Sequence, residues 1–203
     1  MFQEVEFSLV SVCPLLCHNG QTADPLNPYA KKMKALTSVR KKTDENYAEL
    51  ARIEWEAGLY LDDKGQPTLP PHFVEAAVIS GAKKSKLGTQ FKSGFFIDRV
   101  TFHFPEKNKS LDELYELCRD SRTVRVNSSR VVRTRPIFRS WELTGVAQVD
   151  TDTVDVTHIE KALRDAGRLC GMGDYRPQFG RFDVVSVALL SEKPKEKKCQ
   201  LVS

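Results

Sequence analysis

The order of strand-like and helix-like segments is the feature that most limits how this chain can fold. Residues 4–17 alternate polar and apolar side chains before an apolar run, and residues 182–190 form a second strand-like segment. Helical periodicity marks residues 44–60, 69–81 and 156–169 between these two strands. Further strand-like segments lie at residues 92–104, 124–134 and 137–149. With one long insertion removed, this order approximates the split βαβ arrangement. We therefore expect an α+β fold of the RRM or ferredoxin-like type, with an antiparallel sheet and helices on one face.

A long excursion follows the first strand. Residues 18–29 are dense in turn-forming residues, and a basic run leads from them into the helix over residues 44–60. We therefore expect a single RRM-like domain over residues 1–190 with a large helical insertion over residues 18–66. The lysine-rich residues 191–203 are expected to form a basic disordered tail.

The composition favours a soluble, intracellular protein. The chain has 203 residues, of which 40% are hydrophobic, and this is enough for one elaborated domain. Its start lacks the basic and apolar regions of a signal peptide, and no apolar run is long enough to cross a bilayer. Five cysteines without regular spacing argue against a disulfide framework and fit a reducing compartment.

Positive charge is concentrated in residues 119–139, although the formal net charge is only +4. This segment carries seven arginines and one acidic residue, and arginine supplies bidentate phosphate contacts and stacking that lysine lacks. In a strand, Arg133 and Arg135 share one face. Phe138 and Trp141 add the aromatic surfaces that single-strand binders use for base stacking. The alternative interpretation is a basic edge strand that is protected against aggregation.

A glycine-rich loop precedes the last strand. Residues 171–182 contain three glycines together with Tyr175, Arg176 and Arg181. Glycine allows positive φ and presents bare amides to a ligand, while the arginines supply charge and the aromatic residues supply flat faces. The loop is equally explained as a structural connection in which a glycine ends the helix.

A third basic segment follows the helix over residues 69–81. It contains Lys83, Lys84, Lys86 and Lys92. Cations at this position also complement the helix dipole, which gives the cluster a structural explanation. Three basic segments in one small domain nevertheless favour one continuous cationic track.

The sequence supplies no clear catalytic or metal-binding group. Cys13 and Cys17 are spaced like metal ligands beside His18, but no second pair completes a zinc site, and buried small side chains are the preferred interpretation. The glycine-rich loop fits neither a P-loop nor a dinucleotide fingerprint. We expect no enzyme activity, no metal and no cofactor; an RNA endonuclease that uses a histidine such as His103 is the catalytic alternative.

Three segments together resemble the RAMP superfamily, and especially the backbone-forming subunit of CRISPR surveillance complexes. These are the strand running into a Pro-Leu step at residues 12–19, the proline and small-residue helix at residues 69–78, and the glycine-rich loop at residues 171–182. The whole chain also looks like a phage-encoded RAMP-like protein. The resemblance implies an RRM-like core, assembly into a filament along a single strand, an inserted region that helps to grip the strand, and the cytoplasm of a bacterial host cell.

The residues and the resemblance together predict a non-enzymatic protein that binds single-stranded DNA or RNA and assembles along it as a homo-oligomer, without a membrane partner. The alternative is a protein-interaction or anti-defence role, in which the chain mimics a CRISPR backbone subunit; exposed arginines and aromatics also suit protein interfaces. The candidate nucleic-acid-binding residues are Lys83, Lys84, Lys86, Lys92, Arg130, Arg133, Arg135, Phe138, Arg139, Trp141, Tyr175, Arg176 and Arg181.

Overall fold

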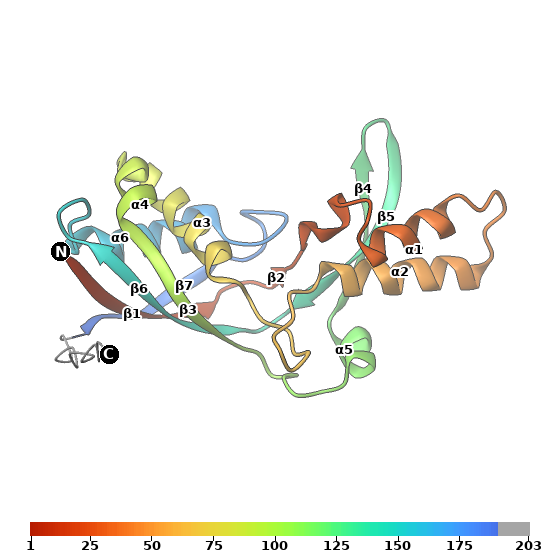
Figure 1. Cartoon of the computed structure of the whole chain (residues 1–203), viewed down its shortest axis with the longest axis horizontal. Helices are drawn as coiled ribbons and strands as arrows, with labels where there is room; N and C mark the ends of the chain where they lie inside the picture. The colour runs from red at the N-terminus through yellow and green to blue at the C-terminus, as the bar shows by residue number, and fades with distance from the viewer. Residues whose placement is uncertain (191–203) are drawn as a thin grey trace, which may run out of the picture.

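A four-stranded antiparallel sheet forms one end of an elongated molecule (Figure 1). The computed structural model describes residues 1–190, so the predicted tail at 191–203 lies outside the described residues. The strand order is β3-β6-β1-β7. The strands are β1 (Phe2–Ser11), β3 (Phe95–His103), β6 (Glu142–Asp150) and β7 (Phe182–Leu190).

Helices cover one face of this sheet (Figure 1). They are α3 (Pro71–Ala82), α4 (Gly88–Gly94) and α6 (Thr157–Asp165). The alternation read in the first strand explains this arrangement, because Val5, Phe7 and Leu9 are buried while Glu4 and Glu6 on the opposite face are exposed. The expected α+β, ferredoxin-like fold is therefore confirmed.

A second, three-stranded sheet lies at the other end of the molecule, and the sequence did not predict it. Its order is β2-β5-β4, with β2 (Leu15–Leu16), β4 (Arg119–Val126) and β5 (Ser129–Phe138). The hairpin expected near residues 127–129 is the β4–β5 hairpin, and Asn127 turns the chain with φ +55°. The expected strand over residues 137–149 is divided, because β5 ends in the small sheet and β6 belongs to the large one.

The region predicted as an insertion packs against this second sheet. It contains α1 (Pro28–Thr37) and α2 (Asp44–Gly58), and the short helix α5 (Leu111–Leu117) lies nearby (Figure 1). Thr43 caps α2 through a capping box with Asn46. Helix α1 was not predicted, because the turn-forming residues before it obscured its start. Asn27 caps the helix and Pro28 occupies its first position.

One apolar cluster joins the two sheets. Phe102 of β3 and Phe138 of β5 pack edge to face with ring centroids 5.1 Å apart, and Trp141 lies 6.5 Å from Phe102. Trp55 of α2 is fully buried in the same cluster and donates its indole N–H to the Cys118 carbonyl at 2.9 Å. The insertion is therefore fixed to the core through α2.

Candidate nucleic-acid interface

The glycine-rich loop and the arginine-rich hairpin meet, although they are far apart in the sequence. The Asp174 carboxylate pairs with Arg135 Nε of β5 at 3.0 Å. The Arg122 guanidinium of β4 lies over the Phe179 ring at 4.5 Å and the Tyr175 ring at 5.4 Å from the centroids. These contacts bring two of the three predicted basic segments together.

The glycines of the loop serve packing rather than ligand contact. Gly180 has φ +71°, and a Cβ built there would lie 1.8 Å from the Met172 carbonyl oxygen. The Gly180 amide donates to the Pro14 carbonyl at 2.8 Å, and the Asp174 amide donates to the Leu16 carbonyl at 2.9 Å. The Gly171 amide donates to the Ala166 carbonyl at 2.7 Å and ends the helix, as the structural interpretation of the loop held.

The two aromatic residues predicted as stacking surfaces lie in the core. Phe138 and Trp141 are each only 1% exposed, and the Trp141 indole N–H donates to the Cys13 carbonyl at 3.2 Å. Their assignment to base stacking is wrong, because the chain enters the buried core at the end of β5. Tyr175, which is 40% exposed, is the predicted aromatic that remains at the surface.

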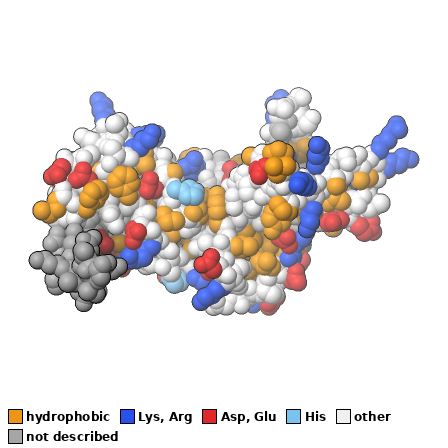
Figure 2. Space-filling model, in the orientation of Figure 1, with side chains coloured by type: hydrophobic (Ala, Val, Ile, Leu, Met, Phe, Trp, Pro, Cys, Tyr) orange, Lys and Arg blue, Asp and Glu red, His pale blue; other side chains and the backbone are white. Residues whose placement is uncertain are grey.

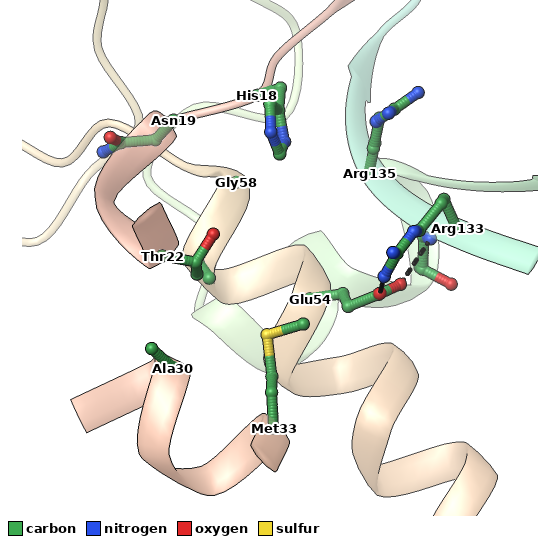
Figure 3. Close-up of a pocket in the computed structure, with 11 residues that line it drawn as sticks. His18, Asn19, Thr22, Ala30, Met33, Glu54, Gly58, Arg133 and Arg135 are labelled. Carbon is green, nitrogen blue, oxygen red and sulfur yellow. Dashed lines mark hydrogen bonds and ion pairs between the residues drawn. The ribbon is translucent and has the colours of Figure 1, made fainter. Parts of the chain in front are cut away.

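Three of the predicted arginines have partners within the chain. Arg133 pairs with Glu54 of α2, whose other carboxylate oxygen accepts from the Thr134 amide at 3.0 Å (Figure 3). Arg135 pairs with Asp174, and Arg139 donates to the Leu117 carbonyl at 2.6 Å. Arg133 and Arg135, which were expected to share a face, line one pocket together with Thr134. The ion pair with Glu54 ties Arg133 to α2, and the ion pair with Asp174 ties Arg135 to the glycine-rich loop.

Arg130 and Arg181 are exposed but do not join one cluster. Arg130 lies at the start of β5, beside the hairpin turn. Arg181 directly precedes β7, where its carbonyl accepts from the Val12 amide at 2.9 Å. A single unbroken arginine track, as the sequence suggested, is therefore not formed.

The lysine segment gathers around Arg176 of the glycine-rich loop. Lys83, Lys86, Lys92 and Arg176 line an open hollow of about 750 Å³, which we call the cationic hollow. None of the described residues that line it is acidic, and none of the ion pairs formed within residues 1–190 uses one of these four cations. Figure 2 shows Lys and Arg side chains standing out above the α4 end of the molecule.

The cations of the cationic hollow come from the turn after α3, from α4 and from the glycine-rich loop. Lys83 lies in the 3-10 turn after α3, Lys92 lies in α4 rather than in the predicted strand, and Lys86 adopts φ +62° between them. Lys84 is exposed on the same turn but outside the lining. Because like charges gather here without neutralising carboxylates, the hollow attracts anions.

The open face of the large sheet has the opposite charge. Glu4 and Glu6 lie on it, and so do Glu142 and Asp183, which both pair with Val10 across neighbouring strands. All four carboxylates belong to exposed residues. Arg99 of β3 also lies on this face, but the four carboxylates outnumber it, so the face disfavours phosphate groups, even though RRM-like domains commonly bind RNA on the sheet.

The thiols of Cys17 and Cys118 are buried in the core. Burial raises the pKa of the Cys17 thiol, helped by the Asp174 carboxylate, and burial raises the pKa of Cys118 to about 11. Protonated thiols are poor metal ligands. Within residues 1–190, no group of three or more His, Cys, Asp or Glu side chains gathers to hold a metal ion. None of the helices described there has the length and hydropathy of a membrane-spanning helix.

Comparison with known proteins identifies a fold relationship only. No family model matches the chain, and no curated protein matches its sequence. A chain from the cryo-EM structure of the type III-B Cmr-beta complex bound to cognate target RNA superimposes with a TM-score of 0.53 at 12% identity. The match covers 93% of this chain but 61% of that chain. The protein therefore spans about three fifths of the length of its structural neighbour and shares its fold.

Proposed function

We propose that the protein binds single-stranded nucleic acid without catalysing a reaction, and that the cationic hollow is its main phosphate-binding surface. The observation that carries this proposal is the convergence of Lys83, Lys86, Lys92 and Arg176 on one open hollow whose described lining has no acidic residue. Gathering unneutralised cations costs folding free energy through mutual repulsion. A bound polyanion removes that repulsion.

The surroundings of the hollow favour a flexible strand over a duplex. Exposed Tyr175 adjoins Arg176 in the loop, so a base can stack close to the phosphate contact. The structural neighbour belongs to a complex that is bound to target RNA, and the shared fold makes RNA the first ligand to test. Assembly of several copies along one strand belongs to the same proposal and is tested by the stoichiometry on long oligonucleotides.

Removing two charges from the hollow should weaken binding and flatten its salt dependence. We expect the Lys83→Ala/Arg176→Ala variant to lose about tenfold in affinity for an oligonucleotide of about 16 nucleotides. The slope of log K against log salt should fall by about 1.4, because each single-strand phosphate contact contributes about 0.7. Fluorescence anisotropy at several salt concentrations measures both quantities.

A control with the same loss of charge separates the hollow from net charge. Lys31 and Lys64 are exposed and lie outside the hollow, so Lys31→Ala/Lys64→Ala should leave the slope nearly unchanged. Equal losses in both variants would show that binding follows net charge alone. The proposal fails outright if neither RNA nor DNA oligonucleotides bind the unaltered protein at low salt.

A further inference from the structure

A second cavity lies between the insertion and the hairpin (Figure 3). Its volume is about 440 Å³, which falls in the usual range of small-molecule sites, roughly 300–1,000 Å³. We call it the insertion pocket. It is formed by α1, α2, β5 and the segment after β2.

The two sides of the insertion pocket differ in chemistry. Ala30 and Met33 of α1 form an apolar wall, and in Figure 3 the Met33 side chain points from α1 toward Glu54. His18 and Arg135 lie on the opposite, polar side. A ligand that fits must combine a flat apolar portion with polar or anionic groups. Methionine is suited to the flat portion, because its thioether makes favourable contacts with aromatic rings.

One cationic donor in the lining is unsatisfied. Arg133 is engaged by Glu54, whose side chain is only 7% exposed, so this pair forms a neutral part of the wall. Arg135 Nε lies 3.0 Å from Asp174 Oδ2 in an ion pair, and both Arg135 Nη1 and Asp174 Oδ2 are buried without a hydrogen-bond partner. A buried guanidinium N–H without a partner is costly, and an acceptor supplied by a ligand would remove that cost.

The glycine-rich loop connects the insertion pocket with the cationic hollow. Asp174 contacts Arg135 in the wall of the pocket, and Arg176, two residues further along, lines the hollow. A strand whose phosphates lie in the hollow can therefore pass over the exposed Tyr175 and reach the pocket.

We infer that the insertion pocket binds one nucleotide of the strand, with the base against Ala30 and Met33 and a phosphate oxygen on the Arg135 guanidinium. The guanidinium group suits phosphate because it donates in a planar fork, and the apolar wall suits the face of a base. This inference rests on the proposed function for the strand that delivers the nucleotide. The pocket itself is tested with a free nucleotide.

Filling the pocket should abolish nucleotide binding without changing the charge. We expect adenosine 5′-monophosphate to bind the full chain, and Ala30→Trp to weaken that binding by about tenfold or more, because the indole occupies the space of the base. Ala35→Trp is the control, since Ala35 lies on the same helix, is exposed and does not line the pocket. NMR line broadening and calorimetry measure binding, and circular dichroism confirms folding. Thr22→Trp fills the pocket from another element if Ala30→Trp does not fold.

The outcomes separate this inference from the proposed function. Both proposals are supported if an oligonucleotide displaces the mononucleotide and if only the filled variants lose mononucleotide binding. The pocket is overturned if the protein binds oligonucleotides in a salt-dependent way but does not bind the mononucleotide. It is also overturned if the filled variants still bind the mononucleotide. Both results leave the proposed function intact. Mononucleotide binding without oligonucleotide binding overturns the strand path and the proposed function together.

Discussion

Gly180→Ala should lower the free energy of unfolding by about 4 kcal/mol. Two costs add at this position: a non-glycine residue at φ +71° costs about 1 to 2 kcal/mol, and the new Cβ lies 1.8 Å from the Met172 carbonyl oxygen. The carbonyl cannot retreat easily, because Met172 is fully buried and its amide donates to the Gly180 carbonyl at 2.9 Å. Urea denaturation followed by circular dichroism measures the loss.

Two other glycines separate these costs. Gly65 has φ +73° and no atom within 4 Å of a built Cβ, so Gly65→Ala should cost only about 1 kcal/mol. Gly20 has neither a left-handed φ nor any atom within 4 Å of a built Cβ, so Gly20→Ala should be nearly neutral. If Gly180→Ala costs no more than Gly65→Ala, the loop is not packed as described. Its amides would then be available to a ligand, as the first interpretation of the loop held.

The rigidity of this loop matters for the candidate site. The same hydrogen bonds that consume the amides place Asp174 against Arg135 and Arg176 in the cationic hollow. The glycines thus position charged side chains and do not bind the strand themselves. A loop variant that still folds should lose nucleic-acid affinity, because Arg176 would no longer face the lysines.

Local patterns explain why much of the fold could be predicted from the sequence. The alternation in β1 shows directly which side chains face the helices, and the caps of α2 and α5 involve residues only three positions apart. Helix α1 escaped prediction because its sequence is polar and follows turn formers, so its helical state depends on packing against α2. The second sheet escaped prediction because β2 is only two residues long.

The candidate site was harder to predict, because charge partners are distant in sequence. Arg133 and Glu54 lie 79 positions apart, and no local pattern indicates that this carboxylate neutralises that arginine. Phe138 and Trp141 looked like stacking residues because basic residues surround them in sequence, yet the strand carries them into the core. The lysine segment and Arg176, by contrast, do line one hollow, although they are far apart in the sequence.

Arg133→Ala should destabilise the protein, whereas Arg130→Ala should leave its stability nearly unchanged. Without Arg133, the Glu54 carboxylate stays buried with the Thr134 amide as its remaining donor, at 3.0 Å. Removing one partner of a buried ion pair costs about 3 kcal/mol or more, and the 38% exposure of Arg133 reduces this to about 2 kcal/mol. Arg130 is exposed and forms no ion pair within residues 1–190, so its removal should change stability by less than about 0.5 kcal/mol.

The two variants remove the same charge from the same strand, so net charge cannot explain a difference between them. Denaturation curves and oligonucleotide titrations of both variants give the comparison, and the Glu54→Ala/Arg133→Ala double variant should lose less stability than the sum of its single changes. If Arg133→Ala leaves stability unchanged and flattens the salt dependence instead, Arg133 contacts phosphate. The strand would then run along β5, and the hollow would be only one part of its path.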